Sequence, residues 1–260
     1  IALVVGAMAF TRHYSHPEAK YLWMAVGFIG AGLLDGFHTA LTTWLSAVYF
    51  PTLLDAAAKW SEFAPRFFLA LMLCFSGWSN QAAQDVNERF IYFMAAIVFV
   101  VCVYVFAISG LPVPQQAESL IRQPVELIPA ALCGIAFLGF LKNGNWRDKA
   151  RKFDHFAMVS LIAAAFSHGA LMAFSQHPLD ASFDLAHYAK IFAYLCILFG
   201  LLNSMRYAFQ QAFHGDRRFR EAVETLGEGF ALYDSEDRLV VFNEAYAKLH
   251  PATRDIIKVG

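Results

Sequence analysis

The chain has 260 residues, of which 58% are hydrophobic and 16% are charged, and its formal net charge is −1. A soluble domain usually carries roughly a quarter charged residues and about half apolar ones at most. The composition therefore excludes a disordered chain, and the lack of a basic surplus excludes a nucleic-acid-binding protein. It also contains 26 phenylalanines, which suit lipid-facing helices. We predict an all-α polytopic membrane protein that contacts the lipid bilayer.

Apolar runs of membrane-spanning length divide most of the chain into predicted spans. The first run, 1–10, is too short to cross a bilayer and is interpreted as the end of a longer helix. Further runs follow at 21–45, 66–80, 90–110, 125–141, 155–175 and 187–209. Because the 66–80 run is short, we expect its helix to begin earlier and to kink at Pro65. These runs predict a seven-helix transmembrane domain over residues 1–209.

The distribution of Lys and Arg predicts the orientation of the bundle. The 142–152 loop holds five basic residues, and four arginines lie at or beyond the end of the last span, at Arg206, Arg217, Arg218 and Arg220. The positive-inside rule places both segments in the cytoplasm. Counting crossings, 11–20 and 81–89 are then also cytoplasmic, and 46–64, 111–124 and 176–186 face outward. The carboxyl end is predicted to be cytoplasmic.

Ionisable residues interrupt the predicted spans at Asp35, His38, Arg66, His168, His187 and Lys190. With a rise of about 1.5 Å per residue, all of them fall in the outer half of the bilayer. Asp35 and His38 are three positions apart and share a helix face, as do His187 and Lys190. Unpaired charges in this setting are costly. We therefore expect Asp35 to pair with Lys190 or Arg66, and His38 with His187.

Three interpretations of these polar residues remain open. They form a structural cluster that fixes helix register, a pocket for a small ligand entering from outside, or a site for a metal ion or haem b. The metal or haem interpretation uses His38, His187 or His168 as imidazole ligands. The candidate ligand-binding residues are Asp35, His38, Trp60, Arg66, His168, His187 and Lys190.

The remaining cysteines and histidines give weaker signals. The cysteines are scattered singly without metal-binding spacing and are predicted to be small buried hydrophobes, at Cys74, Cys102, Cys133 and Cys196. Several histidines lie in predicted loops, near span ends or in the tail, and are expected to be solvated or interfacial: His13, His16, His155, His214 and His250. We base no site on these residues.

Composition changes after about residue 210, where a charged helix is predicted over 210–224. Phe219, Ala222 and Val223 form a narrow apolar stripe, which fits either pairing with a second copy or an ordinary juxtamembrane helix. Residues 225–260 then predict a strand, an acidic turn, a second strand at 239–242 and a helix capped by Asn243.

The stretch EGFALYD…DRLVVFNEAY within residues 225–260 resembles the start of a PAS domain, an α+β fold. The resemblance covers about 35 residues. Since the chain stops before such a domain could close, we expect it to be part of a longer protein.

Three stretches together resemble the MASE3 group of bacterial membrane-associated sensor domains. These are GLLDGFHTA at 32–40, the Pro51-Thr52, Trp60 and Arg66 segment, and AHYAKIFAYLCILFG at 186–200. Ala186 departs from the glycine of the family pattern. The resemblance makes His38, Arg66, His187 and Lys190 marker positions. It implies an input region in the bacterial inner membrane, working as a homodimer.

The function predicted from these features is sensory input to a sensor histidine kinase or, less expected, a diguanylate cyclase. Neither output domain is contained in these 260 residues. The alternative is a membrane redox protein carrying haem b, or a transporter, that uses the intramembrane histidines directly. A PAS-like segment after the last span favours the sensor, because a cytochrome or carrier has no need of one.

Overall fold

The computed structural model describes residues 1–45, 54–79, 87–108, 121–143, 153–175 and 180–249. The chain divides into two compact units, Ile1–Arg206 and Tyr207–Gly260, and each is described by itself. The Pro51-Thr52 part of the family pattern, most of the predicted 111–124 and 142–152 loops, and the chain beyond 249 lie outside the described residues.

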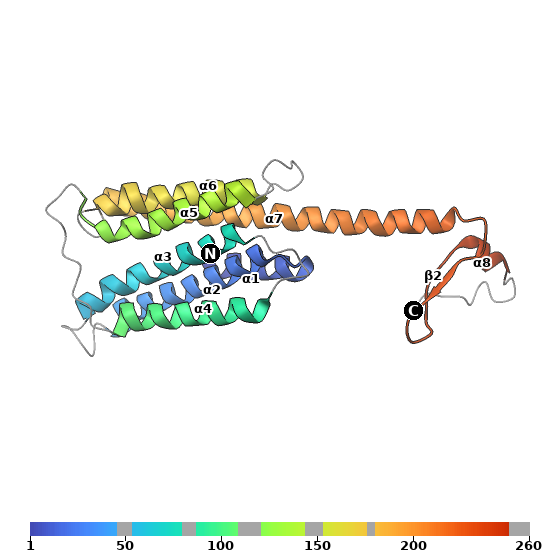
Figure 1. Ribbon diagram of the computed structural model, residues 1–260, viewed down its shortest axis with the longest axis horizontal. Coiled ribbons are helices and arrows are strands. Elements are labelled where there is room, and N and C mark those ends of the chain that lie inside the picture. The colour runs from blue at the N-terminus through green and yellow to red at the C-terminus, as the bar shows by residue number, and fades with distance from the viewer. Residues whose placement is uncertain (46–53, 80–86, 109–120, 144–152, 176–179, 250–260) are drawn as a thin grey trace. The chain divides into compact units, whose positions relative to one another are not determined.

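The first unit is a bundle of helices that run side by side in alternating directions (Figure 1). Its described elements are α1 (Ala2–Ser15), α2 (Ala19–Ala40) with the π-helix η1 (Leu41–Leu45), α3 (Leu54–Trp78), α4 (Glu88–Val103) with the π-helix η3 (Tyr104–Ile108), the 3-10 turn η4 (Pro124–Glu126) leading into α5 (Leu127–Asn143), α6 (Phe153–Phe166) with the π-helix η5 (Ser167–Leu171) and the 3-10 turn η6 (Met172–Phe174), and the first part of α7 (Ala181–Glu224).

The prediction of membrane-spanning helices is confirmed for part of the bundle. Within the described residues, five helical stretches are long and apolar enough to cross a membrane: Ala19–Thr43, Glu88–Phe106, Pro124–Asn143, Phe153–Phe174 and Ala181–Glu224. The helix around the 66–80 run does start earlier, at Leu54, and Pro65 lies inside it. Charged residues in its first half, such as Glu62 and Arg66, explain why it is less apolar than its neighbours.

Helix α2 lies at the centre of the bundle. Its buried side chains contribute to both hydrophobic clusters of the unit, one shared with α1, α3, α5, α6 and α7 and the other with α3 and α4. Close approach depends on small residues, as is common between membrane helices. A Cβ added at Gly27 would lie 2.7 Å from Met72 Cβ on α3, and one at Gly200 on α7 would lie 2.8 Å from Phe156 Cβ on α6.

The second unit contains the end of α7 and a small hairpin. Strands β1 (Ala231–Tyr233) and β2 (Leu239–Phe242) pair antiparallel and lead into α8 (Glu244–Leu249). In the turn, the Asp234 carboxylate accepts the backbone N–H groups of Arg238 and Glu236. These bonds favour the ionised form and hold the Asp234 pKa below its usual value. The predicted strand, turn, strand and helix are therefore present.

Asn243 connects the parts of the second unit. Its side-chain oxygen accepts the N–H groups of Tyr246, capping α8, and of Phe230 before β1. Its amide donates to the carbonyl oxygens of Val223 at 3.1 Å and Glu228 at 2.8 Å. Since the residue is fully buried, these bonds fix where α7 ends relative to the hairpin. Val223 is buried here, whereas Phe219 is exposed, so the apolar stripe predicted for pairing is only partly free.

Candidate functional site

One polar cluster lies where α2, α4 and α6 end. We call it the Arg66 cluster. It consists of Asp35 and His38 from α2, Ser61, Glu62 and Arg66 from α3, Glu126 from η4, His168 from η5 and Lys190 from α7. The three π-helical segments among the described residues belong to this end, since η1 follows His38, η3 carries Phe106 beside Trp60, and η5 carries His168. Such irregular turns are frequent at functional sites.

Arg66 is the centre of the cluster and is buried. Its guanidinium donates to Glu126 Oε1 and, one helical turn away on α3, to Glu62 Oε1. The Arg66 and Glu126 side chains are only 6% and 5% exposed. A charge removed from water to this extent is tolerated only with close counter-charges. The two carboxylates therefore explain how an arginine sits inside an apolar bundle.

Glu126 carries the network on to a second helix. Its other oxygen, Oε2, accepts a hydrogen bond from His168 Nδ1 at 3.0 Å. Arg66, Glu126 and His168 thus link α3, the start of α5 and the end of α6. Sequence reasoning missed Glu126, because it lies directly at the boundary between a predicted loop and a span. The available signal was a single carboxylate at the start of an apolar run, after Pro124.

Lys190 ties α7 to α2. Its ammonium lies 3.0 Å from Asp35 Oδ2 and 3.2 Å from Oδ1. The sequence left Asp35 with two potential partners, and the structure selects Lys190 because Arg66 is occupied by Glu62 and Glu126. The pair is partly accessible, with side chains 25% and 37% exposed. Its Coulomb attraction is therefore weaker than that of the buried Arg66 pair.

The expected contact between His38 and His187 is replaced by two others. His38 Nδ1 lies 2.8 Å from Ser61 Oγ on α3, which ties α2 to α3. His187 Nδ1 bonds to the Phe183 carbonyl of its own helix at 2.9 Å, and its ring packs on that of Phe183. His187 thus bonds to the preceding turn of its own helix α7, where we expected a bond to His38 on α2.

Two further predictions concern metal binding and Trp60. Within the described residues, no group of three or more His, Cys, Asp or Glu side chains could hold a metal ion, so no site of three such ligands forms around His38, His168 or His187. A haem site built on two of them stays a prediction. Trp60 packs among aromatic rings, 5.6 Å from Phe106 and 6.0 Å from Phe63 between centroids. The four cysteines are buried, as predicted.

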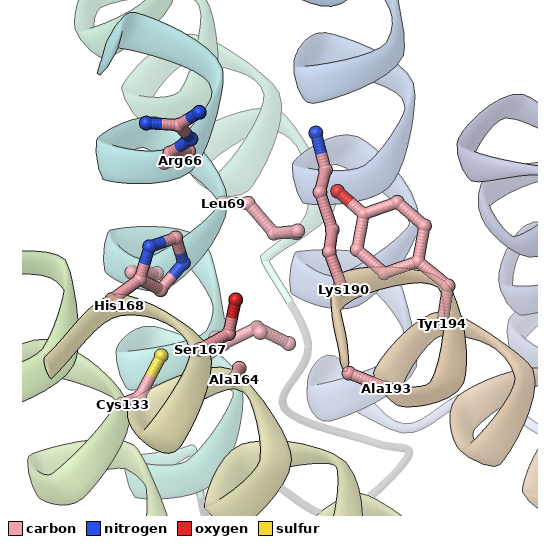
Figure 2. Close-up of a pocket in the computed structure, with 11 residues that line it drawn as sticks. Arg66, Leu69, Cys133, Ala164, Ser167, His168, Lys190, Ala193 and Tyr194 are labelled. Atoms are coloured by element: carbon pink, nitrogen blue, oxygen red, sulfur yellow. The ribbon is translucent and has the colours of Figure 1, made fainter. Parts of the chain in front are cut away.

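A small cavity lies beside the Arg66 cluster, between α3, α5, η5 and α7 (Figure 2). Its volume is about 30 Å³, and its polar lining comes from Arg66, Ser167, His168, Lys190 and Tyr194. In Figure 2, the polar ends of the Ser167, Lys190 and Tyr194 side chains point toward the side of the pocket where Arg66 lies. This volume suits one or two water molecules and lies far below that of a typical organic-ligand pocket.

A second polar cluster lies at the opposite end of the bundle and was not predicted. We call it the Ser204 cluster. It consists of Arg12, His13, Glu18, Lys20, Tyr21, Glu88, Asp154 and Ser204. His13, which we expected to be solvated or interfacial, is fully buried, and its two ring nitrogens bond to the Glu18 carbonyl and to Glu88 Oε1, each at 3.0 Å.

Ser204 is the contact of α7 within this cluster. Its hydroxyl oxygen accepts a hydrogen bond from Arg12 Nε at 2.7 Å and lies 3.2 Å from the Tyr21 hydroxyl. Arg12 also donates to Glu18 and stacks over the Tyr21 ring at 4.6 Å. Helices α1, α2 and α7 therefore meet in one polar contact.

The comparisons with known proteins agree with the membrane-embedded architecture. The sequence model of a family described as MASE3, a membrane-associated sensor domain, matches residues 1–205. This range covers every residue of the Arg66 and Ser204 clusters. No curated protein and no solved structure matches the chain.

Proposed function

The chain belongs to the MASE3 family of membrane-associated sensor domains, and we propose that it is the membrane-embedded input module of a bacterial sensor histidine kinase. It would lie in the inner membrane as a multi-pass bundle, with the end of α7 in the cytoplasm. A cue acts on the Arg66 cluster, and α7 relays the change to the segment that follows. The observation that carries this proposal is the attachment of α7 to both polar clusters.

The two attachments have the same spacing on both helices. Lys190 and Ser204 are fourteen residues apart on α7, and their partners Asp35 and Tyr21 are fourteen residues apart on α2. Fourteen residues make about four helical turns, or about 21 Å, so both contacts lie on one face of each helix. Helices α2 and α7 are thus fixed in antiparallel register. Loss of one contact would free α7 to shift or rotate, which is a known switching motion.

The cue itself is proposed to be small. Free space of about 30 Å³ beside Arg66, His168 and Lys190 admits water or an ion of similar size without rearrangement. A larger ligand would have to separate the helices. Either event changes the balance of charges around the Asp35–Lys190 pair, the direct link to α7.

The second unit supports a relay into a PAS-like domain. Its strand, turn, strand and Asn243-capped helix follow the order that begins such a domain. Because the Asn243 amide donates to the Val223 carbonyl, a displacement at the end of α7 is passed to the hairpin through a direct hydrogen bond.

We also propose that two copies pair along the second half of α7. Phe209 and Phe213 are 64% and 70% exposed and lie one turn apart on the same helix face. Large apolar side chains on a helix beyond the bundle are stabilised when another helix covers them. A Phe213→Cys variant should crosslink to a dimer under oxidation, and a monomeric result would refute this contact.

The relay is tested by exchanging the charges of Asp35 and Lys190 through substitution. In full-length protein reconstituted in nanodiscs, Asp35→Lys and Lys190→Asp should each change basal autophosphorylation, and the double variant should restore it by reversing the ion pair. Lys142→Met is the matched control, because Lys142 lies on α5 over the ring of Trp78 on α3. If the double variant behaves as the sum of the single variants, the Asp35–Lys190 contact does not control the output. An absorption spectrum of the same protein tests for haem b.

A further inference from the structure

We propose that a groove on α6 and α7, at the end of the bundle where the Ser204 cluster lies, binds an anionic phospholipid through its headgroup phosphate. This inference concerns a different surface from the Arg66 cluster. It is independent of which cue the domain senses.

The groove combines apolar and cationic walls. Phe156 on α6 and Phe199 and Leu202 on α7 form its apolar part, while Asn203 and Arg206 on α7 form its polar end. It has a volume of about 590 Å³ and is open to the surroundings. Phe199 and Leu202 are exposed, so they face lipid in a membrane. A groove of this composition fits an amphipathic ligand rather than a wholly polar one.

The two parts of the groove are spaced as in a phospholipid. Phe199 and Arg206 are seven residues apart, which places them on the same face of α7 at a separation of about 10 Å along its axis. A headgroup phosphate at Arg206 would therefore leave the first part of an acyl chain beside Phe199. The ligand lies along the surface, since Gly200 brings α7 too close to Phe156 for a chain to pass between the helices.

The charge at Arg206 points to an anion. Elsewhere in the bundle, Arg12, Lys20, Arg66 and Lys190 each pair with a carboxylate. Among the residues that the structure describes, no acidic side chain pairs with exposed Arg206. A guanidinium can donate two parallel hydrogen bonds to phosphate oxygens, and the neighbouring Asn203 amide supplies a further donor. The charge and donor geometry are thus complementary to a phosphate.

The same charge disfavours a second copy of the chain as the occupant. If two copies met through this face in parallel, Arg206 would approach Arg206 of the other copy, and like charges repel. A phosphate removes that repulsion. Phe209 and Phe213 share this face of α7 with Arg206, so the proposed pairing of two copies also needs Arg206 to be neutralised.

The experiment measures lipid binding by native mass spectrometry of the purified chain in detergent. Phosphatidylglycerol, phosphatidylcholine and inorganic phosphate are added separately. We expect phosphatidylglycerol to bind wild type about tenfold more tightly than phosphatidylcholine does, and Arg206→Gln to remove that preference. Arg217→Gln, which removes an exposed arginine paired with Glu221, should bind like wild type. Phe199→Ala should weaken phosphatidylglycerol binding, because it removes the apolar wall.

Three results would overturn the inference. The first is equal phosphatidylglycerol binding by Arg206→Gln and Arg217→Gln. The second is displacement of the lipid by inorganic phosphate with no effect of Phe199→Ala, which would indicate a free-phosphate site. The third is a change in the fraction of dimer in Arg206→Gln or Phe199→Ala while lipid binding stays unchanged, which would assign the groove to a second copy. If Arg206→Gln fails to fold, Arg206→Lys and Asn203→Ala provide the same comparison. We expect Arg206→Lys to lose part of the preference for phosphatidylglycerol over phosphatidylcholine, and Asn203→Ala to lose it clearly.

Discussion

Replacing Glu126 with Gln removes one of the two carboxylates that neutralise the buried Arg66 guanidinium. Breaking a buried ion pair by removing one partner typically costs about 3–5 kcal/mol, because an uncompensated charge stays behind. Glu62 remains as a second partner, so we expect the lower end of this range, about 3 kcal/mol. The Gln amide keeps only one acceptor oxygen, so either Arg66 or His168 Nδ1 also loses its hydrogen-bond acceptor.

Asp35→Asn is the matched comparison. It also removes a carboxylate from an ion pair, but the Lys190 side chain that remains is 25% exposed and can be solvated. Its cost should therefore stay near or below about 1 kcal/mol. In a domain of this size, about 1 kcal/mol shifts the melting temperature by roughly 2–4 °C. We expect a decrease of about 6–12 °C for Glu126→Gln and of at most about 4 °C for Asp35→Asn.

Thermal unfolding of the purified protein, followed by tryptophan fluorescence, measures both decreases. An Arg66→Met/Glu126→Gln double variant serves as the control. It should melt above Glu126→Gln alone, because the orphaned buried charge is gone and the remaining Glu62 side chain is 31% exposed. Equal decreases for Glu126→Gln and Asp35→Asn would refute the argument that burial determines the cost.

Three further predictions concern α7 and the tail. Ser204→Ala removes the acceptor for Arg12 Nε and should destabilise the bundle by about 1 kcal/mol while altering basal autophosphorylation; an unchanged output would separate Ser204 from the relay. Asn243→Ala removes the cap of α8 and the bond to Val223, so amide exchange over 225–249 should accelerate while the melting temperature of the bundle stays constant. The Asp234 pKa is depressed in the folded hairpin, so its stabilisation is present above the ordinary value of 3.8 and is lost as pH falls through the lower folded value. The protection of the Glu236 and Arg238 amides, measured against the intrinsic exchange rate at each pH, should therefore fall only at acidic pH, and Asp234→Asn should remove that dependence.

The two polar clusters hold the helices through contacts of different kinds. In the Arg66 cluster the ionic contacts range from buried, at Arg66, to partly exposed, at Lys190. A buried pair holds helices in place, whereas a partly exposed pair is the easier one to break. The link to α7 is therefore the weaker one, as a relay requires. The Ser204 cluster adds a second contact fourteen residues further along the same helix.

Local patterns in the sequence determined the elements of this protein. Apolar runs predicted the helices that are long enough to span a membrane, and the acidic turn before Leu239 with Asn243 after Phe242 predicted the hairpin and the capped helix. These features depend on residues that are close in the chain. Neighbours fix helical periodicity, turn conformation and capping before any long-range contact forms.

The tertiary structure alone decided which polar groups meet. Asp35 could have paired with Arg66 or Lys190 by depth in the bilayer, and the choice followed from Glu62 and Glu126 occupying Arg66. Glu126 lay at a predicted boundary, and Ser204 is an inconspicuous residue in an apolar helix. Which partner a buried charge finds depends on how the helices pack and turn about their axes, and residues far apart in the chain set that packing.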